Sequence, residues 1–164
     1  NPGVGIPDGG RKSGPLSIHP NITPTQRRTP MALSNVGKPK DTTDIELTHP
    51  VTGETLLNDD GSTMTVTVYG PYSDTYRKVN HDQQNKRLMR AQRSGGKVNL
   101  TAEEIEASSL ELLVKCTADW KITLEDGKGI EPFSHDAARD VYTQYPWLRE
   151  QIDAVFGDTK AFLG

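Results

Sequence analysis

The feature of this sequence that most constrains its fold is a stripe of apolar residues between positions 101 and 120. Its members recur near one face of a helix: Ile105, Leu110, Leu112, Leu113, Val114, Cys116 and Trp120. Thr101 and Glu104 precede the stripe with the spacing of a helix-capping box. We therefore predict a helix that starts at Thr101, runs along this stripe and is the most buried helix of the chain.

Short segments of alternating polar and apolar residues precede this helix. Residues 44–48 and 63–69 alternate with the period of a half-buried strand, and the second segment is rich in β-branched side chains. Turn-forming residues at positions 49–53 follow the first segment, and residues 54–57 can return as a strand. A second turn at positions 59–62 leads into residues 63–69. We predict an antiparallel meander of two or three strands. Whether 44–48 and 63–69 pair directly stays open.

The ends of two more helices are visible in the sequence. Ser73 or Asp74 can cap a helix that runs to about Arg93, where a Ser-Gly-Gly triplet ends it. Ser134 can cap another helix over residues 135–144. These two segments add helices on either side of the apolar stripe.

A last helix begins at Pro146, a residue that suits a first helical turn. Its apolar side consists of Trp147, Leu148, Ile152, Val155 and Phe156. Residues 121–124 are expected to form a short strand before it. The predicted fold class is α+β, with a small antiparallel β-meander of two or three strands followed by a bundle of about four helices and with a disordered N-terminal tail.

Residues 1–30 differ in composition from the rest of the chain. They contain six prolines and five glycines, and proline sustains neither a helix nor a central strand. Their formal charge is +3, which leaves −6 for residues 31–164. We predict a disordered tail, either leader or added sequence before a native start at Met31 or a basic arm that binds a partner. Residues 31–164 are predicted to form one domain, with a β part at 31–72 and a helical part at 73–164.

Side chains that could carry catalysis are sparse. The four histidines lie 30 or more residues apart, and the one cysteine, Cys116, belongs to the apolar stripe, where cysteine behaves as a small hydrophobic residue. A nucleophile–base pair of Cys116 with His81 or His135 is conceivable, but burial of Cys116 is the stronger interpretation. We therefore expect no enzyme activity, no catalytic residues, no cofactor and no metal ion.

Composition favours a small, soluble, intracellular protein. Apolar residues make up 33% of the chain, which allows only a small core. No stretch approaches the roughly 20 apolar residues of a transmembrane helix, and no secretory signal opens the chain. A single cysteine suits a reducing compartment.

Charge is distributed unevenly along the chain. Residues 77–97 contain seven basic residues and one acidic residue, whereas residues 98–164 contain thirteen acidic and six basic residues. This basic helix could bind phosphates, the acidic half of a neighbouring copy in a head-to-tail assembly, or the chain's own acidic helices. Nucleic-acid binding is disfavoured because the net charge of the chain is negative and because no aromatic residues for stacking on nucleobases lie among the basic residues.

Several short motifs occur in a fixed order between Ser34 and Leu163. They are Gly37-Lys38-Pro39, His49-Pro50-Val51-Thr52-Gly53-Glu54, Asp60-Gly61, Tyr69-Gly70, Leu100-Thr101-Ala102-Glu103-Glu104, Asp119-Trp120, Asp126-Gly127, and the ending Tyr145-Pro146-Trp147-Leu148-Arg149-Glu150-Gln151-Ile152 with Asp158, Phe162 and Leu163. In the order of these motifs, and in the basic helix that lies between Tyr69-Gly70 and Leu100, the chain resembles the tail assembly chaperone family of long-tailed bacteriophages. Residues 1–30 lie outside the resemblance.

The resemblance implies a non-enzymatic and temporary function in the host cytoplasm. Chaperones of this family bind the long helical tape measure protein, keep it soluble and help to recruit tail tube subunits, and they are absent from the mature virion. Many are made in two lengths, the longer by a ribosomal frameshift. The implied partners are the tape measure protein and the tail tube protein, together with self-association and without a membrane.

Two groups of side chains are candidates for contacting these partners. The first is basic and lies in the helix after Ser73: Arg77, Lys78, Lys86, Arg87, Arg90 and Arg93. The second is apolar and looks exposed near the end of the chain: Trp147, Phe156, Phe162 and Leu163. The competing interpretation assigns four residues of the last helix to the core: Trp147, Leu148, Ile152 and Phe156.

Two other functions also fit the sequence. A structural virion protein, such as a tail or head completion subunit, would also be small, partly β and self-associating, and it would use residues 1–30 as a mobile arm. A nucleic-acid-binding regulator would use the basic helix, and its binding would fall steeply with salt.

Overall fold

The computed structural model describes residue 3 and residues 30–163. The chain divides into two units, residues 1–31 and 32–164, and all the helices and strands described belong to the second. The disordered tail predicted for residues 1–30 lies outside the described residues, apart from Gly3 and Pro30.

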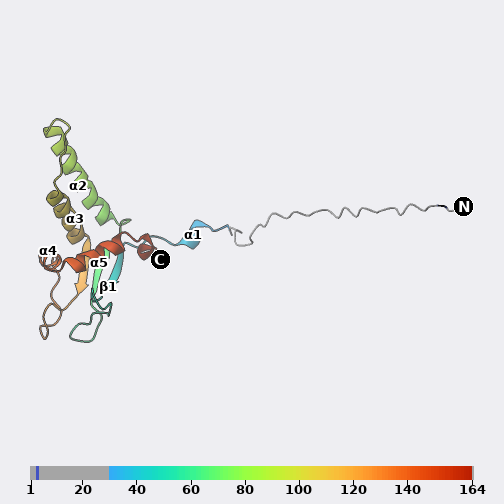
Figure 1. Cartoon of the computed structure of the whole chain (residues 1–164), viewed down its shortest axis with the longest axis vertical. Helices are drawn as coiled ribbons and strands as arrows, with labels where there is room; N and C mark the ends of the chain where they lie inside the picture. Colours follow the sequence, from blue (N-terminus) through green and yellow to red (C-terminus); the bar gives the residue numbers. More distant parts are fainter. Residues whose placement is uncertain (1–2, 4–29, 164) are drawn as a thin grey trace. The chain divides into compact units, whose positions relative to one another are not determined.

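The second unit has the predicted α+β fold (Figure 1). A three-stranded antiparallel sheet is combined with helices that mostly follow its first two strands. Along the described residues the elements are α1 (Leu33–Val36), β1 (Thr42–Glu46), β2 (Thr65–Tyr69), α2 (Asp74–Arg93), α3 (Ala102–Cys116), β3 (Thr117–Lys121), α4 (His135–Gln144), α5 (Pro146–Phe156) and the short 3-10 helix η2 (Thr159–Phe162).

The two segments whose pairing the sequence left open are neighbouring strands. The sheet has the order β1-β2-β3, and Val66 in the central strand lies opposite Ile45 on one side and Trp120 on the other. Residues directly opposite each other in a sheet share a face, and Val68 lies two residues further along the same face. All four side chains are buried, so this face carries the sheet's part of the core.

Residues 54–57, predicted to return as a strand, form no regular strand and make only isolated bridges. Single backbone hydrogen bonds, such as that from the Leu56 N–H to the Leu47 carbonyl (2.9 Å), hold the stretch, and a buried side chain at its end adds to them. The side-chain amide nitrogen of Asn58 (Nδ2) donates hydrogen bonds to the backbone carbonyl oxygens of Thr63 (3.3 Å) and Lys121 (3.2 Å). Isolated backbone hydrogen bonds and the Asn58 side chain therefore connect this segment to its neighbours, without the regular ladder of a strand.

The third strand lies earlier in the chain than predicted. It spans Thr117–Lys121 and not residues 121–124, so α3 ends at Cys116 and Trp120 belongs to the sheet. Backbone groups along the edge of β2 require partners, and this segment supplies them. The apolar stripe that continues to Trp120 is therefore two elements, and the prediction of one helix face was wrong at its end.

The predicted helix starts are confirmed. Side-chain oxygens of Ser73, Thr101 and Ser134 each accept a hydrogen bond from the backbone N–H three residues later, at the starts of α2, α3 and α4. The carboxylate of Glu104 accepts the backbone N–H of Thr101 at 3.1 Å and completes the capping box. α5 begins at Pro146. Caps of this type each stabilise a helix by about 1 kcal/mol.

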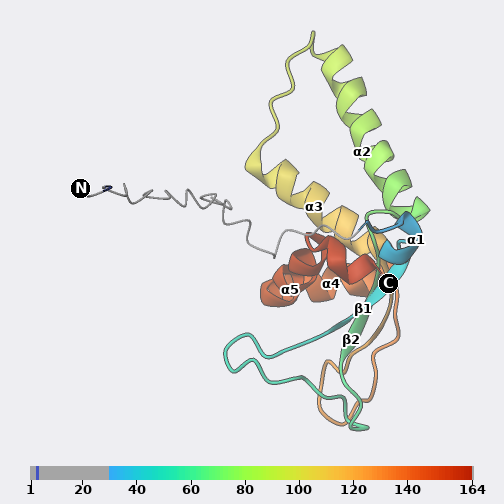
Figure 2. The ribbon, with the colours of Figure 1, turned by 90° about the vertical axis from the view of Figure 1, so that its right-hand side faces the viewer.

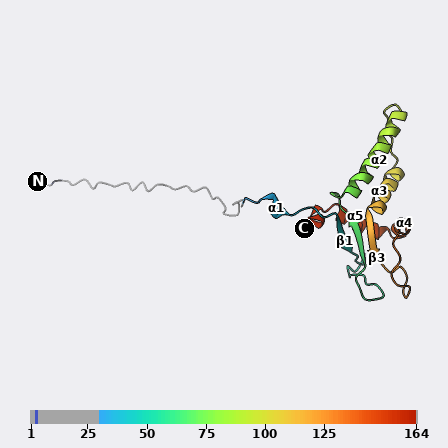
Figure 3. The same ribbon diagram turned by 180° about the vertical axis from the view of Figure 1, so that it is seen from behind.

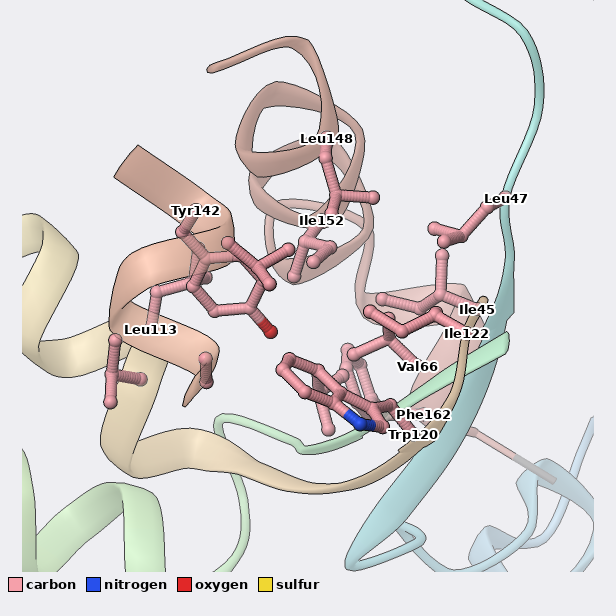
Figure 4. Packing of buried hydrophobic residues seen from close by; sticks show 14 residues of the cluster. Ile45, Leu47, Val66, Leu113, Trp120, Ile122, Tyr142, Leu148, Ile152 and Phe162 are labelled. Carbon is pink, nitrogen blue, oxygen red and sulfur yellow. The ribbon is translucent and has the colours of Figure 1, made fainter. Parts of the chain in front are cut away.

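One hydrophobic core lies between the buried face of the sheet and α3, α4, α5 and η2 (Figure 4). Val66 and Trp120 meet Tyr142 and Ile152 from the helices in this layer. The Tyr142 hydroxyl and the Thr117 hydroxyl form a buried hydrogen bond of 2.7 Å. Tyrosine therefore fills the core without leaving its polar end unpaired.

α2 contributes little to this core. Of its 20 residues only Val79 is buried, and the helix packs mainly against α3. Figures 2 and 3 show both helices leading away from the sheet, joined by residues 94–101. At 1.5 Å per residue, α2 is about 30 Å long. Most of its surface is therefore available to another molecule.

Candidate protein-binding surfaces

Reactive side chains are scattered in the part of the chain that the structure describes. That part has no group of three or more His, Cys, Asp or Glu residues that could hold a metal ion. Burial raises the pKa of Cys116 to about 12, so its thiol stays protonated at neutral pH, and both His81 and His135 are exposed. Among the same residues, every buried side-chain nitrogen and oxygen has a hydrogen-bond partner. None of the described helices combines the length and apolar character needed to cross a membrane.

The basic residues of α2 divide into two groups. Three form exposed ion pairs within the chain: Arg77 with Asp74 (2.7 Å), Lys86 with Glu111 (3.9 Å) and Arg90 with Glu104 (2.7 Å). Lys78, Arg87 and Arg93 are exposed and form no ion pair with a described residue. The Arg77 pair lies within α2, whereas Lys86 and Arg90 reach α3. Because exposed ion pairs contribute only about 0.2–1 kcal/mol, these two pairs hold α2 to α3 weakly. The chain's own acidic residues therefore engage part of the basic helix, and the unpaired cations remain for a partner.

The residues of α5 are divided between the core and the surface. Leu148 and Ile152 are buried in the core, as the competing interpretation held. Trp147 and Phe156 are half-buried, so each packs against the core with one side and keeps another side accessible. These two aromatic residues lie near opposite ends of α5 and belong to two different hollows.

The first hollow, here the Trp147 pocket, opens between the 47–64 segment and the junction of α4 and α5. Its volume is about 160 Å³, and most of its lining residues are apolar, including Leu56, Met64, Ile122, Leu124, Trp147 and Leu148. The Tyr145 and Trp147 rings are 6.2 Å apart in an edge-to-face arrangement beside it. Since Leu124 and Trp147 are only partly covered, they border both the pocket and the solvent.

The second hollow, here the Phe156 groove, lies between α3, the start of α2 and the end of α5. It measures about 250 Å³, and Tyr76, Leu112, Phe156 and Asp153 are among the residues that line it. The Tyr76 and Phe156 rings are 6.1 Å apart. Burial raises the pKa of Asp153, and the positive charge of Arg149 opposes this only in part. The groove is therefore of mixed character, with apolar side chains from three helices and the Asp153 carboxylate at its side.

Phe162 is not an exposed contact residue, and this expectation was wrong. Its ring is 0% exposed, and it lies against Gly70, where a Cβ atom would be 2.8 Å from two of its ring carbons. The Phe162 carbonyl accepts the Lys40 N–H at 2.7 Å, which fixes the end of the chain beside β1. Leu163 keeps 37% of its surface exposed. The missing side chain of Gly70 makes room for Phe162, and no local sequence pattern connects the two.

Several residues that line the hollows were not found from the sequence. Leu124 was assigned to a strand, and Tyr76 and Leu112 were assigned only to helix faces. Asp153 was one carboxylate among the many of the acidic half. Tyr76, Leu112 and Asp153 meet in the Phe156 groove because α2, α3 and α5 pack together, and Leu124 lines the Trp147 pocket. No spacing in the sequence could have indicated either location.

Comparison with known proteins identifies no protein similar to this chain. A scan against models of protein families, a search of curated proteins and a search of solved structures each find no match to this chain. The functional assignment therefore depends on the residues and on the geometry of these surfaces.

Proposed function

We propose that this protein is a non-enzymatic tail assembly chaperone of a long-tailed bacteriophage. It binds the tape measure protein, keeps it soluble in the host cytoplasm and helps to recruit tail tube subunits, and it is absent from the mature virion. Two things support the proposal: the order of sequence motifs between Ser34 and Leu163, and the Trp147 pocket. The pocket carries the structural argument, because it is an apolar opening with room for a side chain of another molecule.

The size of the Trp147 pocket suits one large apolar side chain. A cavity of about 150 Å³ accepts a benzene-sized group, and this pocket has about 160 Å³. An amphipathic helix, the type of segment expected in a tape measure protein, presents apolar side chains at intervals of three and four residues. One of them can enter the pocket while its neighbours lie on the accessible parts of Trp147 and Leu124.

Contact through a pocket of this size is weak enough to be reversed. Burying one apolar side chain contributes about 1.5–3 kcal/mol. A long client would therefore need many chaperone copies to stay covered, and each copy could leave as tail tube subunits arrive. Reversible binding of this kind fits a protein that acts only during assembly.

The proposal is tested by co-expressing the chain with the tape measure protein of the same phage. We expect the wild-type chain to keep the client in the soluble fraction and to co-purify with it. Leu124→Asp places a carboxylate beside the pocket and should release the client to the insoluble fraction. Val51→Asp is the matched control, because Val51 is 86% exposed and does not line the pocket.

Three results would contradict the proposal or change it. A client that stays insoluble with the wild-type chain contradicts chaperone activity. Equal behaviour of Leu124→Asp and Val51→Asp, with both variants folded by circular dichroism, contradicts the pocket as the binding site. Recovery of the chain from purified virions in stoichiometric amounts contradicts a temporary role and supports a structural virion protein.

A further inference from the structure

The last turn of α5 carries negative charge that no neighbouring cation balances. The backbone carbonyl groups at the C-terminal end of a helix are the negative end of its dipole, where a basic side chain is favourable. The last turn of α5 has no basic residue and contains the carboxylate of Asp153 instead. Asp153 forms no ion pair with any described residue. The helix end and the carboxylate therefore both favour a cation from elsewhere.

The nearest arginine along α5 does not supply this cation. The Arg149 guanidinium lies 3.5 Å from the Glu106 carboxylate and donates a hydrogen bond of 3.3 Å to the Glu106 carbonyl. Burial raises the pKa of Asp153, and the positive charge of Arg149 opposes this only in part. Because the Asp153 carboxylate has lost some of its water, an added cation would interact with it more strongly than with a fully solvated carboxylate.

Aromatic rings border the same hollow. Tyr76 of α2 and Phe156 of α5 are half-buried, and their ring centroids are 6.1 Å apart with an interplanar angle of 31°. Leu112 of α3 adds apolar lining, and Ser109 adds a hydroxyl group at the border. Asp153 precedes Phe156 by three residues, so the two lie on the same side of α5. The groove therefore combines ring surfaces, a carboxylate and a hydroxyl group.

This combination suits the side chain of arginine. A guanidinium group is planar and always charged, stacks on aromatic rings, and donates hydrogen bonds in a fixed fork that matches a carboxylate. The apolar stem of arginine can lie along Leu112 while its charged end reaches Asp153. A lysine ammonium offers no planar surface for stacking. A phosphate or carboxylate ligand is disfavoured because Asp153 and the helix end are both negative.

We propose that the Phe156 groove binds an arginine side chain of a partner protein. The guanidinium group stacks on Tyr76 and Phe156 and pairs with the Asp153 carboxylate, and the Ser109 hydroxyl accepts a further N–H. The groove and the Trp147 pocket have no lining residue in common. The inference therefore goes beyond the proposed function and holds whether or not the pocket binds the tape measure protein.

Titration of the whole chain with Nα-acetyl-arginine amide, followed by NMR of the backbone amides, provides the test. We expect saturable shifts at Ser109, Asp153 and Gly157, which line the groove. The matched ligand is Nα-acetyl-citrulline amide, which has the same shape without the charge, at the same ionic strength. It should produce no saturable shift at these positions. A single side chain is expected to bind with a dissociation constant of roughly 1 mM or weaker, so the titration extends to about 100 mM.

Two variants separate the charge from the stacking surface. Asp153→Asn keeps the shape of the side chain and should weaken arginine binding about tenfold, through loss of a charge-assisted hydrogen bond. Tyr76→Leu keeps an apolar side chain and should also weaken binding, because a ring is lost. Asp140→Asn is the matched control, since Asp140 is exposed on α4 and does not line the groove. Unchanged amide spectra away from the groove verify that each variant is folded.

Several outcomes would overturn the inference. Absence of a saturable shift in the groove contradicts it, and so does an equal response to the citrulline ligand or to the corresponding lysine amide. Equal binding by Asp153→Asn and Asp140→Asn contradicts the role of the Asp153 carboxylate. Shifts of the groove amides that appear when the chain alone is concentrated would show that a second copy occupies the groove. None of these results depends on the tape measure protein, so they are distinguishable from a failure of the proposed chaperone function.

Discussion

The substitution Phe162→Ala is expected to destabilise the whole folded unit. The Phe162 ring is fully buried, packs against Gly70 and lies 6.2 Å from the Phe156 ring. Truncating a buried phenylalanine to alanine costs about 3–5 kcal/mol, through lost burial and the cavity that remains. Since the free energy of unfolding of natural domains is about 5–15 kcal/mol, this loss removes a large share of the stability.

Urea denaturation followed by fluorescence of Trp120 and Trp147 measures this loss as a free energy of unfolding. For a unit of this size, 1 kcal/mol corresponds to roughly 4 °C in Tm, so a Tm lower by roughly 12–20 °C is expected in parallel. Leu163→Ala is the matched control, because Leu163 is adjacent in sequence and 37% exposed, and it should cost less than about 1 kcal/mol. A loss of under 1 kcal/mol for Phe162→Ala as well would refute the placement of Phe162 in the core.

A double-mutant cycle with Gly70 sharpens this prediction. Gly70→Ala in the wild-type chain forces the Phe162 ring to move and should cost about 1–3 kcal/mol. In the Phe162→Ala background the added methyl group meets no ring, so Gly70→Ala should cost almost nothing. The two losses are therefore expected to be strongly non-additive. Additive losses would show that these residues do not touch.

Three further predictions concern single interactions. Burial raises the pKa of Tyr142 to about 12. The stability that the protein gains from burying the neutral phenol is therefore fully present below about pH 10 and is lost as the pH rises toward 12. An absorbance titration should show this tyrosine ionising last. Thr101→Ala should cost about 1 kcal/mol and speed amide exchange in the first turn of α3, and unchanged exchange would contradict the capping box. Asp59→Ala removes the two 3.0 Å hydrogen bonds that the Asp59 carboxylate accepts from the backbone N–H groups of Gly127 and Gly129. Amide hydrogen exchange in this loop should become faster, and unchanged exchange would contradict a stabilising role of these bonds.

Local signals in the sequence predicted helix starts well. Ser73, Thr101 and Ser134 begin α2, α3 and α4 because each side chain satisfies a backbone N–H within its own first turn. The alternation at 44–48 and 63–69 indicated two strands for a similar reason, since alternation is a property of the segment itself, and the structure has them at 42–46 and 65–69. These elements need no knowledge of distant residues.

Predictions failed where a distant partner decides the structure. The stripe from Ile105 to Trp120 was taken as one helix face, but β2 requires a neighbour, and Trp120 joins the sheet. Phe162 lies near the end of a polar segment and looked exposed, and its burial depends on the space above Gly70. Packing overrides local periodicity at both positions.

The candidate surfaces were predictable only in part. The sequence singled out Trp147 and Phe156, and both are half-buried aromatic residues beside hollows. It also singled out the basic helix, but only the structure separates the cations that are paired within the chain from Lys78, Arg87 and Arg93, which form no ion pair with a described residue. Asp153 could not have been selected as a groove residue, because its position beside Tyr76 and Leu112 depends on the packing of α5 against α2 and α3.

Hydrogen–deuterium exchange of the chain alone and in complex with the tape measure protein tests the central claim most directly. If the Trp147 pocket binds the client, residues 122–124 and 145–148 should gain protection, while the exposed turn at 49–53 should exchange as before. The Leu124→Asp variant should show no gain in either pocket segment. Failure of the two proteins to form a complex, or protection that leaves both pocket segments unchanged, would contradict the proposed function.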